Sequence, residues 1–457
     1  MLFSSISFLY YFLPCVLVWY FLVPRHFKNI ILLISSLFFY AWGEPRLVLL
    51  MSATIVIGYV LGILMEKDAK HKKLYLIIAL ISFLGALGYF KYTDFFIDNI
   101  NRVTGLSIPL LKIGLPIGIS FYTFQILSYN IDVYRGDVKA QKNLIHLATY
   151  IAMFPQLIAG PIVRYKDVAL QLESREHSID KVAQGIRRFV FGLSKKILIA
   201  NVLGEICESF RISNDKSVLF YWMYAIAFSL HIYFDFSGYS DMAIGLGKIF
   251  GFDFMENFNY PYISKSITEF WRRWHISLGN WFRDYVYIPL GGSKVKVGRH
   301  LFNILVVWML TGFWHGAAWN FIIWGLYFAV LLVIEKTFLL KHLEHSKVLS
   351  HVYVLFLVVI SFVIFSATSL PQVLTDIGGL FGSGNLPLVS AEAAYYLRNY
   401  AVIFVLAILG ATPIPKKLVS KWRIAQYAEP VVLLLLLIVI TAYLVDGSFN
   451  PFLYFRF

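Results

Sequence analysis

The sequence has little charge and almost no cysteine, and both shortages narrow the class of protein. Only 14% of its 457 residues are charged, whereas an average soluble domain is about 25% charged. The two cysteines, Cys15 and Cys207, lie in apolar surroundings far apart in the sequence, so they provide neither a disulfide framework nor metal-ligand spacing. No polar linker divides the chain, which argues against a string of soluble domains.

Several motifs of known chemistry are also missing. The sequence has no Gly-rich phosphate loop, no Ser-His-Asp order and no His-Glu-x-x-His, so it gives no support for a hydride-transfer or redox enzyme. We expect no permanently bound cofactor and no metal. A transporter stays possible on the residues alone, although the paired hydrophobic halves of repeat-built transporters are not detected.

Long hydrophobic runs are what the sequence has in abundance. Hydrophobic residues make up 59% of the chain, and a helix needs about 20 of them to cross a bilayer. On that measure the runs predict an all-α polytopic membrane protein with roughly ten or eleven transmembrane helices. Examples are the runs at 9–23, 30–41, 47–65, 349–365, 400–410 and 431–444.

The charge distribution fits the same class. The formal net charge is +14, and its basic clusters fall between the apolar runs, as in the cytoplasmic loops of membrane proteins. The clusters at 25–28 and 67–73 would lie inside if runs 30–41 and 47–65 form a hairpin through Gly43, Glu44 and Pro45. Nucleic-acid binding is the weaker interpretation. The first segment, 2–23, lacks a basic flank and a cleavage site, so we expect a retained span.

We expect one integral membrane domain over residues 1–457, with three zones of different texture. Plain apolar runs fill the N-terminal wall at 1–112 and the C-terminal helices at 331–457. Gly, Pro, aromatic and charged residues interrupt the runs throughout the core at 113–330. Irregular backbone at membrane depth is tolerated only inside protein or along a water-filled cavity, so this zone should hold the site.

The stretch 263–292 is too charged to span a bilayer but carries several apolar residues per turn, which predicts an interfacial or re-entrant helix pair. Ser266 precedes Glu269 by three positions, a capping-box spacing that marks a helix start, and the Pro-Leu-Gly-Gly at 289–292 would end the pair. Arg272 and Arg273 could bind the phosphates of a cofactor or anchor the helix at anionic headgroups. Arg283, also a possible phosphate ligand, reads most simply as a local ion pair with Asp284.

His315 is the candidate for chemistry. It lies between two apolar stretches, 301–310 and 321–334, and beside Gly312 and Gly316, where small residues allow a helix or substrate to approach closely. An imidazole with a pKa near neutral can take a proton from a hydroxyl nucleophile. The alternative is a core histidine bonded to a backbone carbonyl.

Two further groups carry polar residues in apolar surroundings. His275 ends the run of Trp and Arg that begins at Trp271. In the stretch 231–241, His231 and Asp235 have a spacing that could ligate a metal, but carboxylates lining a polar tunnel through hydrogen bonds are the better account, since intramembrane carboxylates need partners or water.

The central zone as a whole resembles the membrane-bound O-acyltransferase (MBOAT) family, and within it the branch that serves alginate O-acetylation. The resemblance is carried by six segments in order, together with the aromatic tail that ends at Phe457: Ala159–Tyr165 (AGPIVRY), Asp235–Gly247 (DFSGYSDMAIGLG), Glu256–Tyr262 (ENFNYPY), Phe270–Leu278 (FWRRWHISL), Trp281–Gly292 (WFRDYVYIPLGG) and Gly312–Phe321 (GFWHGAAWNF).

This resemblance implies a helical bundle around a central funnel, with His315 as the family's essential histidine and His275 as its second. The residues expected to line the tunnel are Trp274, Asp235, Tyr239, Trp314 and Asn320. The D-alanyl transferases of teichoic acid are a neighbouring branch, and lipid and protein acyltransferases are further away.

The expected function is movement of acetyl from a cytoplasmic donor, acetyl-CoA, across the bacterial inner membrane for O-acetylation of an exported polysaccharide. The acceptor could be the polymer itself or a serine of an extracytoplasmic acetyltransferase that passes acetyl on. Acyl transfer such as D-alanylation of a cell-wall polymer, or a carrier without chemistry, are the alternatives. Membrane lipid is an expected partner and nucleic acid is not.

Overall fold

The computed structural model describes residues 1–158, 160–343, 345–421, 423–446 and 453, with the side chains of 423–426 left out. Within these ranges the chain is helical and contains no β-strand. Its residues fall into two compact units, which the chain visits in alternation. The first comprises 1–189 and 239–255, and the second 190–238 and 256–457.

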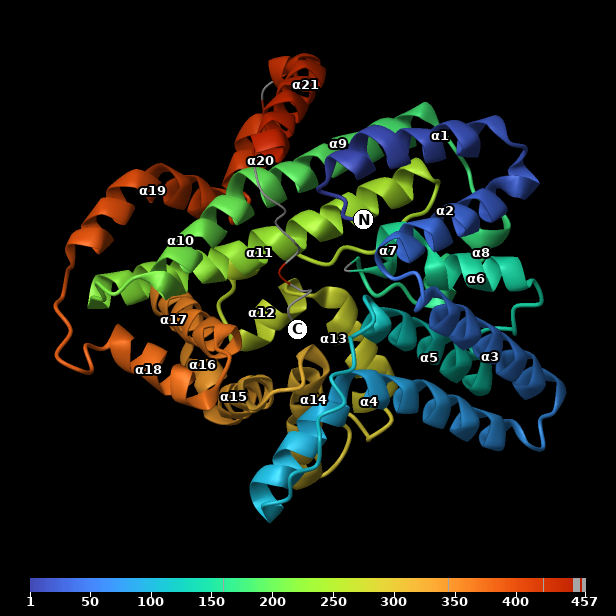
Figure 1. Cartoon of the computed structure of the whole chain (residues 1–457), viewed down its shortest axis with the longest axis horizontal. Coiled ribbons are helices and arrows are strands. Elements are labelled where there is room, and N and C mark those ends of the chain that lie inside the picture. Colours follow the sequence, from blue (N-terminus) through green and yellow to red (C-terminus); the bar gives the residue numbers. More distant parts are fainter. Residues whose placement is uncertain (159, 344, 422, 447–452, 454–457) are drawn as a thin grey trace. The chain divides into compact units, whose positions relative to one another are not determined.

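The first unit holds the N-terminal helices, drawn in blue to green in Figure 1. Within it, α3 packs against α4 and α5. Backbone without regular structure follows α4 at 105–116 and precedes α8 at 160–164, where Gly and Pro interrupt the sequence. The helices of this unit are η1 (Ser7–Phe12), α1 (Leu13–Leu22), η2 (Arg25–Phe27), α2 (Lys28–Gly43), α3 (Val48–Lys67), α4 (Lys72–Thr104), α5 (Ile119–Arg135), α6 (Leu144–Ala152), α7 (Phe154–Leu157), α8 (Tyr165–Glu173) and most of α9 (Ile179–Ser194).

The second unit holds both candidate histidines. Its helices are η3 (Lys195–Ala200), α10 (Asn201–Ile212), most of α11 (Val218–Ile249), η4 (Pro261–Ile263), α12 (Ile267–Arg273), α13 (Ile276–Phe282), η5 (Arg283–Tyr287), α14 (Val297–His315), α15 (Trp319–Ile334), η6 (Glu335–Leu339), α16 (Leu340–Leu343), α17 (Lys347–Ser366), α18 (Leu370–Leu380), α19 (Ala391–Gly410), α20 (Ile414–Val419) and α21 (Arg423–Asp446).

Seven helices of the described chain are long and apolar enough to cross a bilayer. They are Val48–Lys67, Lys72–Thr104, Val218–Ile249, Trp319–Leu343, Lys347–Ser366, Ala391–Gly410 and Tyr427–Asp446. Large apolar side chains on them are exposed, such as Val402 at 70% and Leu434 at 60%, which suits a lipid-facing surface. The prediction of an all-α polytopic membrane protein is confirmed. The first apolar run forms a shorter apolar helix, Ser7–Leu22.

The expected pair of short helices is present, and a turn joins α2 and α3, while the membrane topology of that hairpin stays a prediction. The chain turns at residues 45–47 between α2 and α3. The stretch 263–292 forms the short helices α12 and α13, continued by η5 and a turn at 288–292. Ser266 Oγ caps α12 by accepting from Glu269 N at 3.0 Å, while the Glu269 carboxylate accepts from Lys265 N at 2.9 Å instead of closing the capping box. The single-domain prediction stays a prediction.

Candidate active site

His315 is the last residue of α14, and two glycines determine how α14 meets α15. A Cβ on Gly312 would clash with the backbone of Phe321, and one on Gly325 would clash with the backbone of Trp308. Only glycine therefore permits the close crossing of the two helices, which lie side by side in Figure 1. This crossing brings the end of α14 against the first turns of α15.

The imidazole of His315 is enclosed by aromatic rings and is only 5% exposed. Its ring centroid lies 5.1 Å from Trp314, 5.1 Å from Trp324 and 5.4 Å from Phe365, each packed edge to face. Such a pocket excludes most water, so a proton transferred to the imidazole would be retained rather than lost to solvent.

Trp324, whose ring packs against His315, also carries a buried hydrogen-bond donor. The residue is 1% exposed, and its buried Nε1 has no acceptor among the described residues. A buried donor without an acceptor costs about 1–3 kcal/mol and calls for an explanation.

His275 occupies the turn between α12 and α13 in a left-handed conformation, with φ 44° and ψ 53°. A residue other than glycine is strained there by roughly 1–2 kcal/mol, and such strain clusters at functional sites. Asn257 holds the turn: its Oδ1 lies 3.2 Å from His275 Nδ1 and accepts from Ser277 Oγ at 2.9 Å, and its backbone oxygen accepts from Ile276 N at 3.0 Å. His275 is 1% exposed, and burial lowers its pKa to about 3.

Trp314 connects the two histidines. It adjoins His315 in sequence, and its ring centroid lies 6.1 Å from that of His275. Phe236 packs edge to face against the ring of His275, with ring centroids 4.6 Å apart. The structure thus brings His275, Trp314 and His315 into one aromatic cluster. The catalytic roles of the two histidines and the lining of a tunnel by Trp314 stay predictions.

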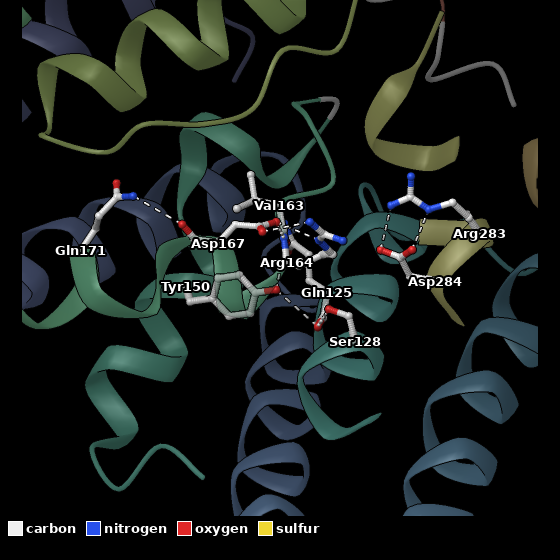
Figure 2. Close-up of polar contacts among 9 residues, drawn as sticks. All are labelled: Gln125, Ser128, Tyr150, Val163, Arg164, Asp167, Gln171, Arg283 and Asp284. Atoms are coloured by element: carbon white, nitrogen blue, oxygen red, sulfur yellow. Dashed lines mark hydrogen bonds and ion pairs between the residues drawn. The ribbon is translucent and has the colours of Figure 1, made fainter. Parts of the chain in front are cut away.

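The three arginines expected to bind a cofactor differ in pairing. Arg273 pairs with Glu269 at 2.8 Å and also donates to Asn259 O at 3.1 Å. Arg283 pairs with Asp284 at 2.7 Å, as Figure 2 shows. Arg272 is exposed and forms no ion pair with a carboxylate among the described residues. Two of the three positive charges are therefore already neutralised locally, and phosphate binding here stays a prediction.

Asp235 is buried in an ion pair with Lys196, both side chains being at most 2% exposed. Its second oxygen accepts from Leu453 N at 2.8 Å. The carboxylate thus has the partners that membrane depth requires. His231, the other half of the possible metal pair, bonds instead to Ala200 O through Nδ1 at 2.6 Å.

The remaining tunnel candidates have packing or anchoring contacts. Trp274 is 4% exposed and stacks on Phe270. Asn320 donates from Nδ2 to Ala367 O at 2.8 Å, which fixes the start of α15 to the end of α17. Tyr239 belongs to the first unit, where its ring stacks on Phe3 with centroids 4.7 Å apart. Lining of a tunnel by these residues stays a prediction.

Residues of the AGPIVRY segment take part in a group of hydrogen bonds at the start of α8 (Figure 2). Arg164 Nε donates to Asp167 Oδ2 at 2.8 Å, and Asp167 caps the helix by accepting from Arg164 N at 3.4 Å. Tyr150 Oη donates to Val163 O at 2.9 Å. This segment therefore has a structural part in the first unit. Ala159 and the aromatic tail, apart from Leu453, lie outside the described residues.

Sequence reasoning missed four residues that shape the second unit. Trp324 and Asn257 contact the two histidines, Lys196 neutralises Asp235, and Glu335 accepts from Thr268 N at 3.0 Å at the start of α12. Lys196 could have been found, because a lysine in an apolar run is the natural partner of an intramembrane carboxylate. The other three become visible only when the helices are packed.

Comparison with known proteins agrees with these observations. The model of the membrane-bound O-acyltransferase family (MBOAT) matches residues 109–374. The chain is 39% identical to the probable alginate O-acetylase AlgI of Azotobacter vinelandii over all of both chains. It is 43% identical to the probable alginate O-acetylase AlgI of Pseudomonas aeruginosa, covering 86% of this chain and 77% of the relative. It is 33% identical to the peptidoglycan O-acetyltransferase of Helicobacter pylori, covering 87% and 84%.

Proposed function

Because this chain belongs to the membrane-bound O-acyltransferase family, and is thus a multi-pass membrane enzyme that transfers acyl groups to oxygen, we propose that it acetylates an exported polysaccharide at the bacterial inner membrane. The observation that carries the proposal is the buried His315 in its aromatic pocket, at the crossing of α14 and α15. The names of its relatives support an acetyl group and a cell-surface polymer.

In the proposed reaction His315 is the general base. It takes the proton of an acceptor hydroxyl as that oxygen attacks the carbonyl carbon of an acetyl thioester. The tetrahedral intermediate then collapses, the carbon–sulfur bond breaks, and the thiolate takes the proton back from His315 and leaves as a thiol. General-base help of this kind is worth about 10²–10⁴-fold in rate.

Trp324 is the donor that we assign to the oxyanion in this scheme. Its indole N–H is buried beside His315 and has no acceptor among the described residues, so it needs no reorganisation when negative charge develops on the carbonyl oxygen. Preorganised donors of this kind contribute about 10²–10³-fold to kcat.

Acetyl-CoA is the donor that the scheme favours, and the acceptor is either the polymer or a serine of an extracytoplasmic acetyltransferase partner. His275 positions the donor in this division of labour. Support for a positioning role comes from its neutral, buried imidazole and from the Asn257 contacts that fix its turn.

Replacing His315 by Ala in the natural host tests the proposal. Base-labile esters on the exported polysaccharide should fall to background while the membrane level of the protein is unchanged. The released acid also separates the acyl groups, since acetate supports this proposal and D-alanine would support the neighbouring branch. Wild-type acetate release from the His315→Ala strain would end it.

A further inference from the structure

A cluster of positive charge in the first unit lacks acidic partners. It consists of Arg25, Lys28 and Arg175, which meet at the ends of α1, α2 and α8. No carboxylate within the described residues forms an ion pair with any of the three, although Glu173 and Glu176 flank Arg175 in the sequence. This contrasts with Arg273 and Arg283, each of which is paired with a neighbouring acid.

Arg175 is held in place by four hydrogen bonds. Its Nε donates to Tyr20 Oη at 3.0 Å and to Phe250 O at 2.9 Å. Its Nη1 donates to Asn29 Oδ1 at 2.7 Å and to Gln171 O at 3.2 Å. The buried Nη2 has no acceptor in the described part of the chain. These bonds fix the guanidinium, so its positive charge is held in one place rather than moving with a flexible side chain.

Lys28 and the N-terminal end of α2 add positive electrostatic potential around Arg175. Lys28 is the first residue of α2, which begins without a side-chain cap and without an acidic residue in its first turn. The N-terminal end of a helix attracts anions and disfavours cations. The Lys28 ammonium lies 4.7 Å from the centroid of the Tyr20 ring, and burial together with Arg175 and Arg25 lowers its pKa.

The pKa of His177 is affected by the same positive electrostatic potential. Its Nε2 lies 2.8 Å from Tyr20 Oη, and burial together with Lys28 and Arg175 lowers the pKa of His177 to about 4. The imidazole is therefore neutral near pH 7 and adds no further charge. Three cations remain at a helix N-terminus, an arrangement that costs free energy until a counter-ion is bound.

We propose that Arg25, Lys28 and Arg175 form a binding site for a phosphate group in the first unit, distinct from the residues that carry the acyl-transfer chemistry. The bound group is neutralised by Lys28 and Arg25 and lies in the field of the oriented guanidinium of Arg175. A lipid headgroup and a soluble phosphate offer the same anion. Apolar side chains exposed beside the cluster, Phe21 at 44% and Leu22 at 75%, are suited to the acyl region of a lipid.

The test uses the purified full chain in neutral detergent with two probes, short-chain phosphatidylglycerol and inorganic phosphate, and binding is followed by native mass spectrometry and by thermal melting. The test variant is Arg25→Gln with Lys28→Gln, which leaves the hydrogen bonds of Arg175 in place. The control variant is Lys70→Gln with Lys73→Gln, which removes two exposed charges from the loop before α4 and from its first turn. A second variant, Arg175→Lys, keeps the charge but loses the fork.

Binding should weaken by about tenfold or more in both test variants and stay unchanged in the control, because charge-assisted hydrogen bonds are lost only at the cluster. Saturable binding of phosphatidylglycerol alone assigns the site to lipid, and saturable binding of inorganic phosphate assigns it to a soluble phosphate. Equal affinity in wild type and in the Arg25→Gln, Lys28→Gln variant, or no binding of either probe, overturns the proposal.

Discussion

Replacing Trp324 by Phe tests the contribution of the indole N–H apart from the packing of the aromatic ring on His315. The change removes Nε1–H and keeps an aromatic side chain in a position that is 1% exposed. If the N–H stabilises the oxyanion, kcat should fall by about 10²–10³-fold, or about 2.7–4 kcal/mol of transition-state free energy. KM for the donor should change little, since the interaction forms mainly in the transition state.

Loss of packing is the competing explanation, and the chain offers a matched control. Trp271 lies in the same aromatic cluster, 5.6 Å from Trp324 between ring centroids, and its buried Nε1 also has no acceptor among the described residues. Trp271→Phe deletes the same atoms and incurs a similar packing cost, which for complete truncation to Ala would be about 3–5 kcal/mol. We expect Trp271→Phe to keep kcat within a few fold.

The assay follows the initial rate of labelled acetyl transfer from acetyl-CoA into polymer in membrane vesicles, normalised to protein level. Thermal melting of the purified variants measures the packing cost separately. Equal losses of kcat in the two variants would assign the effect to packing. An unchanged kcat in Trp324→Phe would refute the oxyanion role and leave a backbone donor as the alternative.

The other predictions concern the second histidine, the exposed arginine and the buried ion pair. Burial lowers the pKa of His275 to about 3, below the 6.5 of an unfolded histidine, so between those values the unfolded chain binds an extra proton and stability should fall as pH falls from 6.5 towards 3. His275→Asn should flatten this part of a melting profile measured from pH 4 to 7. An identical slope in the variant and the wild type would contradict the prediction. If His275 positions the donor, the same variant should also lose less in single-turnover transfer than His315→Ala, although misplacement by about 1 Å can still cost on the order of 10²-fold; equal, complete loss would favour a catalytic pair. Arg272→Gln should raise KM for acetyl-CoA if this exposed charge binds phosphate, whereas reduced membrane levels with unchanged KM would indicate anchoring. Lys196→Met and Asp235→Asn should each destabilise the protein by about 3–5 kcal/mol, because each leaves a buried charge without its partner of opposite sign. The double variant should recover much of this loss in thermal melting. Strictly additive losses would show that the two groups act independently.

The features that depend on composition and on local sequence pattern, such as the membrane-spanning helices, could be predicted from the sequence. Apolar runs such as 47–65 and 349–365 became α3 and α17, because segment length and hydropathy alone decide whether a helix can span a bilayer. The glycines around His315 also carried usable information, since Gly312 is where α14 and α15 approach closely. These features depend on residues close in sequence.

The rest depended on contacts between distant segments. The left-handed turn at His275 is held by Asn257, which comes from the segment before α12, and no propensity predicts a histidine in that conformation. The donor beside His315 comes from the next helix, through Trp324. Ion pairing of Arg273 with Glu269 follows from their spacing on one helix face, yet phosphate binding and headgroup anchoring were the two interpretations considered for this arginine.

Glu335 shows how such distant contacts link the two histidines. This fully buried carboxylate begins η6, which continues the helix that carries Trp324, and it accepts from Ile267 N at 2.5 Å and Thr268 N at 3.0 Å. A carboxylate at a helix N-terminus satisfies free N–H groups and opposes the helix dipole. The start of α12 is thereby fixed to the α15–η6 helix, and the length of α12 then determines where the His275 turn falls. One buried acid thus holds the His275 turn in register with the pocket of His315, and its two backbone contacts explain why a polar side chain stands where an apolar residue would be easier to bury.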